Sequence, residues 1–176
     1  PITVDEVVNS KVIAAPLRLL DCCLISDGGV AFVVSKQPRA AAPIQISGAA
    51  QAHTHQHVSQ APSLTQFGAA DSAKRAMQQA RITHADVDYL AIYDSFTITL
   101  AILLEEIGFA ARGASGALAR GGHFNANGKL PLNTHGGLLS FGHSGAGGAM
   151  AHLAETWLQM ARLASERQIR QPRIAF

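Results

Sequence analysis

A glycine-dense turn that runs directly into an apolar helix constrains this chain more than any other stretch. Residues 133–149 read NTHGGLLSFGHSGAGGA, with six glycines and with His143 placed among the last four of them. Glycine serves where the backbone takes a positive φ or approaches another group closely. Such a turn directs backbone N–H groups and the positive end of the helix to one point, where an imidazole can act as a general acid or base. The alternative is a flexible turn with an incidental histidine.

The composition indicates one domain, or one domain with a tail, that contacts neither nucleic acid nor a membrane. Its 176 residues are 48% hydrophobic, which is enough for a sizeable core. A net charge of +2 is too small to favour nucleic acid or an anionic membrane. We find no signal peptide and no apolar run of about 20 residues, and the adjacent Cys22 and Cys23 cannot form an ordinary structural disulfide. We therefore expect a cytoplasmic protein. Because the pattern starts abruptly at Pro1 and stops at Phe176, we expect a fragment.

Helical spacing of apolar residues recurs three times along the chain. The expected helices cover residues 67–81, 96–107 and 144–163. Thr83 and Asp86 resemble a capping box, Asp94 or Ser95 is expected to cap the second helix, and Gly108 is expected to end it. The third helix carries an apolar stripe that we expect to pack against a neighbouring sheet or helix. The stripe consists of Ala146, Ala149, Met150, Leu153, Ala154, Trp157, Leu158 and Ala161.

Strand signals alternate with these helices and predict an α/β layered fold. Apolar runs or alternating residues predict strands at 30–34, 43–48, 88–93 and from 173 onward, with a linker at 38–42. Residues 110–129 are small and Gly-rich, so we expect a surface excursion there.

Three alternate histidines lie in a long polar loop at residues 49–66. In an extended backbone His53, His55 and His57 point to one face, which is compatible with a metal site. The loop contains no carboxylate or cysteine to complete a ligand set, so the favoured interpretation is solvated histidines without metal.

Five stretches together resemble the thiolase superfamily, and more narrowly the sterol-carrier-protein-x type thiolases and the related lipid-transfer-protein branch. They are RLLDCCLISDGGVAFVVS (18–35), AHTHQHVSQAPSLTQFGAA (52–70), DVDYLAIYDSFTITLAILLEEIGF (86–109), GKLPLNTHGGLLSFGHSGAGGA (128–149) and RQIRQPRIAF (167–176). The resemblance implies a layered thiolase-like fold with a mixed sheet packed by helices. Residues 1–41 are then the tail of the N-terminal half with a linker, and residues 42–176 are the C-terminal domain, truncated before its last strand.

The resemblance also implies a reaction. Such enzymes make or break a carbon–carbon bond beside an acyl-CoA thioester, with coenzyme A thioester as substrate and no permanently bound cofactor. The catalytic histidine of the family matches His143, although Ser144 stands where the family usually has proline. The family's nucleophilic cysteine and its C-x-G motif have no match here, and Cys22 and Cys23 fall on a structural stretch. Whether this polypeptide is itself an enzyme therefore stays open.

Tyr93 departs from the sterol-carrier type, which carries HDCF where this chain has Tyr93-Asp94-Ser95-Phe96. In the family the first position faces the active site and binds the thioester oxygen as charge develops. A tyrosine phenol can donate a hydrogen bond there but is a poor base at pH 7. Tyrosine at this position also resembles the lipid-transfer-protein aldolases, which cleave β-hydroxy acyl-CoA by a retro-aldol route with an OB-fold/zinc-ribbon partner. Otherwise Tyr93 simply ends a strand with its ring in the core.

Three functions therefore fit the sequence. The first is an acyl-CoA thiolase or acyltransferase in which His143 is the base and Tyr93 the oxyanion donor. The second is the retro-aldolase, and the third is a non-catalytic thiolase-fold fragment or subunit. The resemblance further implies a homodimer, with coenzyme A in a cleft beside the 49–66 loop, and we expect Asn133 and His135 to shape the loop near His143.

Overall fold

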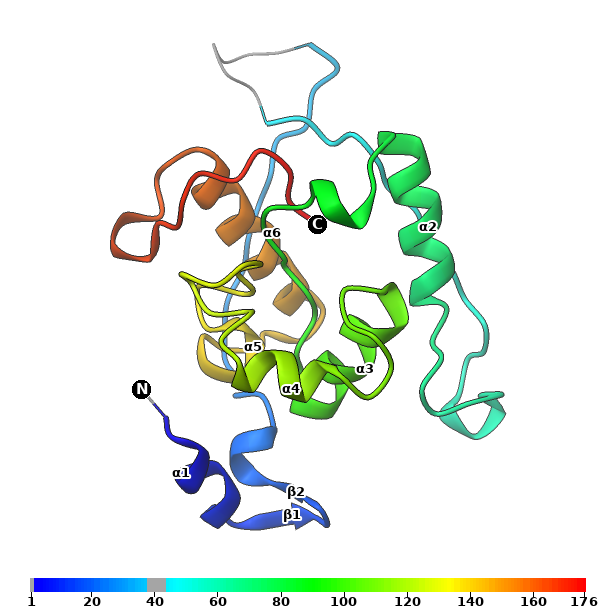
Figure 1. Ribbon diagram of the computed structural model, residues 1–176, viewed down its shortest axis with the longest axis vertical. Helices are drawn as coiled ribbons and strands as arrows, with labels where there is room; N and C mark the ends of the chain where they lie inside the picture. The colour runs from blue at the N-terminus through cyan, green and yellow to red at the C-terminus, as the bar shows by residue number, and fades with distance from the viewer. Residues whose placement is uncertain (1, 38–43) are drawn as a thin grey trace.

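Helices dominate the regular structure of residues 2–37 and 44–176, which a computed structural model describes (Figure 1). A short helix, α1 (Val4–Asn9), leads into the antiparallel hairpin β1 (Val12–Ala14) and β2 (Leu17–Arg18). The other helices are α2 (Ala69–Ala80), α3 (Thr97–Ile107), α4 (Ser115–Arg120), α5 (Gly137–Ser140) and α6 (Gly148–Met160). Single 3-10 turns occupy η1 (Leu19–Asp21), η2 (Val58–Gln60), η3 (His84–Asp86), η4 (Gly145–Gly147) and η5 (Ser165–Arg167). No helix of the described residues is both long and apolar enough to cross a membrane.

Three segments lie side by side in the centre and pair through single parallel bridges. Leu90 is bridged to Leu132 on one side, and Tyr89 to Ala175 on the other. The strands predicted at 88–93 and from 173 onward therefore pair, although over one residue each.

Two predicted strands are wrong within the described residues. Residues 30–34 and 44–48 form no strand, and Val33 is 89% exposed. A strand needs a partner backbone, and none of the described segments pairs with either run. Pro43, the 38–42 linker and the predicted domain boundary between 41 and 42 lie outside the described residues.

The first two predicted helices are confirmed as α2 and α3, and so is the capping box. The Asp86 carboxylate accepts the backbone N–H of Thr83 at 2.8 Å. Gly108 ends α3 at a φ of +99°. The predicted cap is wrong, because the residue that precedes α3 is Phe96 and no side chain caps it. Asp94 binds elsewhere, as described below.

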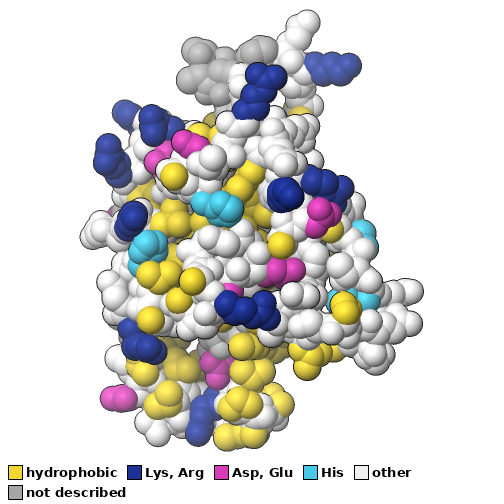
Figure 2. All heavy atoms as spheres, turned by 45° about the vertical axis from the view of Figure 1, so that its right-hand side comes forward, with side chains coloured by type: hydrophobic (Ala, Val, Ile, Leu, Met, Phe, Trp, Pro, Cys, Tyr) yellow, Lys and Arg dark blue, Asp and Glu magenta, His cyan; other side chains and the backbone are white. Residues whose placement is uncertain are grey.

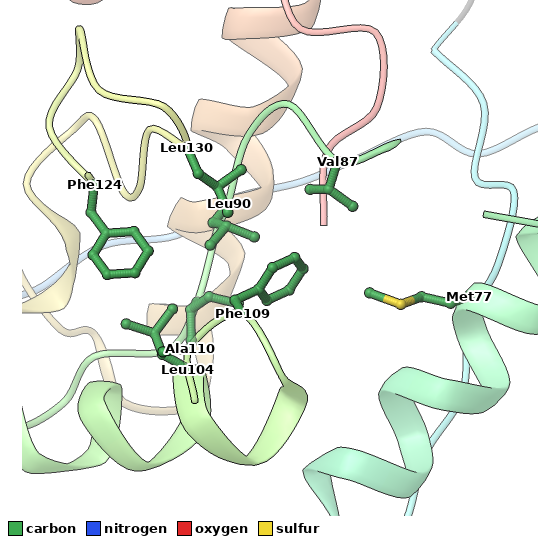
Figure 3. Close-up of a cluster of buried hydrophobic side chains, with 9 residues drawn as sticks. Met77, Val87, Leu90, Leu104, Phe109, Ala110, Phe124 and Leu130 are labelled. Carbon is green, nitrogen blue, oxygen red and sulfur yellow. The ribbon is translucent and has the colours of Figure 1, made fainter. Parts of the chain in front are cut away.

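An apolar core joins α2, α3 and the central segments (Figure 3). It consists of Met77, Val87, Leu90, Ile92, Leu104, Phe109, Ala110, Phe124 and Leu130. The stretch 110–129 lies largely at the surface, as predicted, but it also forms α4 and buries Phe124 to 8% exposure. On the face in Figure 2, Lys and Arg side chains are scattered among acidic and apolar ones and form no continuous basic patch.

Helix α6 packs with a polar face inward, which contradicts the predicted apolar stripe. Its buried residues are Gly148, His152, Glu155 and Gln159. These lie at the three- and four-residue spacing of one helix face. Leu153 and Trp157, from the predicted stripe, are 53% and 45% exposed. The polar face can be buried because its groups find hydrogen-bond partners inside the protein. The helix itself is shorter than the predicted 144–163 and follows η4 directly.

Candidate active site

The structure brings Tyr93 and His143 into direct contact, although 50 residues separate them along the chain. The Tyr93 hydroxyl lies 2.6 Å from His143 Nε2, a short hydrogen bond. The two rings meet edge to face, with centroids 5.7 Å apart and planes at 89°. Tyr93 keeps 37% of its surface exposed, so a molecule from solvent can reach the pair.

Backbone contacts and a glycine fix the place of the His143 ring. The His143 N–H donates to the carbonyl of Leu24 at 2.7 Å, and its carbonyl accepts from the N–H of Ser26 at 3.2 Å. A Cβ at Gly148 would lie 2.7 Å from His143 Nδ1, so only glycine lets the first turn of α6 approach the ring so closely. The glycine-dense turn therefore delivers the imidazole to the helix N-terminus, as its pattern suggests.

Asn133 holds the backbone just before Tyr93. Its side-chain Oδ1 accepts the N–H of Ile92 at 3.0 Å, and its Nδ2 donates to the carbonyl of Ile92 at 2.8 Å. This is the pairing that a neighbouring strand would supply, and it comes from a residue that is only 8% exposed. Asn133 therefore shapes the local backbone, in agreement with the expectation.

Asp94, which follows Tyr93, and the neighbouring His152 are buried, and His135 beside His152 is half-buried. His152 is 3% exposed, and its Nε2 lies 3.2 Å from Asp94 Oδ1, close enough for an electrostatic contact although not aligned as a hydrogen bond. The His135 ring lies 5.1 Å from the His152 ring, centroid to centroid. Burial first, and then the neighbouring His152, lower the pKa of His135 from 6.5 to about 4, which keeps its imidazole neutral at pH 7.

A polar network continues along the inner face of α6. Gln159, fully buried, donates through Nε2 to Glu155 Oε1 at 2.9 Å and to Thr134 Oγ1 at 3.0 Å. Arg167 pairs with Glu155 at 3.0 Å. Burial raises the pKa of the Glu155 carboxyl, but hydrogen bonds from Arg167, Gln159 and Thr134 outweigh it and leave that pKa below its ordinary value. The network anchors Thr134, which lies at the start of the glycine-dense turn.

Sequence reasoning missed His152 and the role of Asp94. The available signal was the polar set at 152, 155 and 159, which shares one face of the predicted helix with Gly148. The apolar residues on the opposite side instead predict that side as the face that packs inward.

The side chains of the remaining candidates make no hydrogen bond to Tyr93 or His143 among the described residues. The Cys22 thiol contacts the carbonyl of Arg18 at 3.3 Å, and the Cys23 N–H donates to Ser95. His55 bonds to the Thr54 hydroxyl, while His53 and His57 face solvent. Within the described residues no three His, Cys, Asp or Glu side chains are placed to hold a metal ion.

Comparison with known proteins relates this chain to thiolase-type proteins. The family described as "Thiolase C-terminal domain-like" matches residues 50–176. The acetyl-CoA acetyltransferase of Methanothermobacter thermautotrophicus is 32% identical over 173 residues, covering 96% of this chain and 45% of that protein. A steroid side-chain-cleaving aldolase of Thermomonospora curvata is 37% identical over 150 residues, covering 79% of this chain and 38% of its own length.

A solved structure described as the Ltp2–ChsH2(DUF35) aldolase superposes with a TM-score of 0.77 at 28% identity, over 93% of this chain and 44% of that chain. The chain thus spans less than half the length of these relatives. The matches confirm the α/β thiolase-like fold. The chain belongs to the thiolase C-terminal domain-like family.

Proposed function

We propose that the protein acts on a carbon–carbon bond beside the thioester carbonyl of an acyl-CoA, with Tyr93 and His143 as its catalytic pair. The observation that carries this proposal is the 2.6 Å hydrogen bond between the Tyr93 hydroxyl and His143 Nε2. A neutral imidazole at this distance can take the phenol proton while the phenol oxygen takes a proton from the substrate. The pair therefore works as a proton relay that neither residue forms alone.

Retro-aldol cleavage of a β-hydroxy acyl-CoA is the reaction that this geometry supports best. The Tyr93 oxygen removes the proton from the β-hydroxyl as its own proton passes to His143. The β-oxygen becomes a carbonyl, the bond between the α and β carbons breaks, and its electron pair goes to the thioester enolate. Returning the proton to the α carbon releases a ketone or aldehyde and a shorter acyl-CoA. No further reactant is needed, and the similarity to the steroid side-chain-cleaving aldolase supports this choice.

Thiolytic acyl transfer is the second candidate, favoured by the similarity to the acetyl-CoA acetyltransferase and by the place of His143 in the glycine turn. In this reaction His143 is the base that activates a thiol, and Tyr93 donates its hydrogen bond to the thioester oxygen. The two candidates differ in their need for free coenzyme A, which thiolysis consumes and the retro-aldol reaction does not.

The proposal extends to the assembly. We propose a homodimer in which residues 42–176 form the C-terminal domain and an OB-fold/zinc-ribbon protein is the partner. The similar aldolase structure is described with a DUF35 component, which supports this kind of partner. A cytoplasmic location stays a prediction.

The test is an assay of the complete protein on two matched substrates, a β-hydroxy acyl-CoA without coenzyme A and a β-keto acyl-CoA with it. We expect Tyr93→Phe and His143→Ala each to lower kcat by about 10²–10⁴-fold, the usual scale for lost proton transfer. Tyr89→Phe is the matched control, because its hydroxyl bonds to Thr134 and not to His143. A wild-type kcat in Tyr93→Phe would refute the proton relay. If the wild-type protein forms product from neither substrate, the protein is a non-catalytic subunit.

A further inference from the structure

The Asp94 carboxylate lies buried between the two segments that carry Tyr93 and His143. Asp94 follows Tyr93 directly and is 3% exposed. Its Oδ1 accepts the backbone N–H of Leu138 at 2.8 Å. Leu138 is fully buried and stands five residues before His143 in the glycine turn. A carboxylate that accepts an N–H away from water forms one of the stronger hydrogen bonds of a protein, so this contact ties the two segments together.

Gly137 brings the turn close enough for that contact. Its φ is +63°, and a Cβ built on it would lie only 1.9 Å from Asp94 Oδ2. The backbone at 137 and 138 therefore approaches both oxygens of the carboxylate, one by close contact and one by a hydrogen bond. Any side chain at 137 would push Asp94 out of this position.

Helix α6 completes the arrangement from the other side. Its His152 contacts Asp94 Oδ1 at 3.2 Å through Nε2, with both side chains 4% exposed. Gly148, four residues earlier on the same face of α6, abuts the His143 ring. One helix face thus touches the carboxylate and the catalytic imidazole together.

We propose that Asp94 is a positioning residue that holds Tyr93 and His143 at hydrogen-bond distance, acting through the Leu138 N–H and with His152 behind it. Asn133 fixes Ile92 on the other flank, so Tyr93 is held on both sides by the segment that leads to His143. Asp94 does not cap α3, whose preceding residue is Phe96. The expected effect on kcat rests on the proposed function, whereas the expected loss of the hydrogen bond between Tyr93 and His143 does not.

The experiment compares Asp94→Asn and Asp94→Ala in the complete protein with Asp71→Asn, a control acid that lies exposed on α2. The first readout is the ¹³Cζ resonance of labelled Tyr93, assigned with Tyr93→Phe and referenced to His143→Ala, in which its hydrogen bond is absent. We expect Asp94→Ala to move this resonance to the reference position and to lower kcat by about 10²-fold with KM nearly unchanged, the cost of a misplacement near 1 Å. Asp94→Asn keeps an acceptor oxygen but loses the charge. We therefore expect an intermediate shift of the Tyr93 resonance and a kcat about 10-fold below wild type, because a smaller misplacement costs less.

Two results would overturn the proposal. One is a folded Asp94 variant with an unmoved Tyr93 resonance, whatever its activity, and the other is a moved resonance with wild-type kcat. If Asp94→Ala does not fold, Asp94→Asn decides by the same criteria. If the wild type has no activity but the resonance moves as expected, the positioning role stands and the proposed function fails.

Discussion

Replacing Gly137 by alanine separates a backbone effect from a packing effect in one comparison. Gly145 is the matched control, because it shares the φ of +63° and a Cβ there would meet nothing within 4 Å. At Gly137 the same Cβ would lie 1.9 Å from Asp94 Oδ2. Both variants carry the same left-handed backbone cost, and only Gly137→Ala displaces the carboxylate.

The expected magnitudes follow from these two terms. A left-handed backbone costs alanine about 1–2 kcal/mol, and the reduced freedom of the unfolded chain returns about 0.4–1 kcal/mol. We therefore expect Gly145→Ala to lose about 0.5–1 kcal/mol of unfolding free energy. Gly137→Ala also loses the hydrogen bond from Leu138 to a charged acceptor, about 1.5–3 kcal/mol, for a total of about 2–4 kcal/mol.

Urea denaturation at pH 7 measures both losses, with the single tryptophan, Trp157, as fluorescence probe. A Gly137→Ala/Asp94→Ala double variant adds a control, because without the carboxylate the new Cβ meets no obstacle. We therefore expect the double variant to lose less unfolding free energy than the sum of the losses in the two single variants. Equal losses in Gly137→Ala and Gly145→Ala would refute the reasoning, because the close approach to Asp94 would then have no energetic weight.

Two further predictions concern pH. The folded-state pKa of His135 is about 4 against 6.5 in the unfolded chain, so the unfolded state binds more protons between these values and stability falls as pH drops from 6.5 to 4. Urea midpoints at several pH values should show a flatter profile in this window for His135→Gln, and an unchanged slope would contradict the burial argument. The Glu155 carboxyl, with its lowered pKa, stabilises the fold above pH 4.5 and loses that contribution as pH falls through its folded-state value. Thermal unfolding should therefore show Glu155→Gln less stable than wild type at pH 7, with the difference shrinking as pH falls below 4.5. A constant difference would argue against the ion pair with Arg167.

The sequence predicted those features that depend on local patterns. Helices α2 and α3, the Thr83 capping box and the stop at Gly108 follow from spacing and end residues within about a dozen positions. The family resemblance alone assigned Tyr93 and His143 to one active site, and it predicted no contact between them, since no local pattern joins residues 50 positions apart.

Other features depend on partners far along the chain and could not be read from local patterns. The run at 30–34 has strand character, but a strand forms only against another backbone. The inward face of α6 was misassigned because hydrophobicity ranks Leu153 and Trp157 above Glu155 and Gln159. The polar pair is buried because Arg167, Thr134 and the backbone of Ile169 satisfy it, and these partners lie outside the helix, where its periodicity gives no information.

The polar inner face of α6 also limits how this helix can turn about its own axis. A helix packed by aliphatic side chains can rotate slightly or slip lengthwise and still bury similar hydrocarbon area. Gln159 accepts the N–H of Ile169 at 3.0 Å and donates to the carbonyl of Arg167 at 2.7 Å, and such bonds tolerate little change of direction. Moving α6 by one residue would swing this side chain by about 100° and leave buried groups without partners. The rotational setting of α6 is therefore discrete, and Gly148 stays opposite the His143 ring.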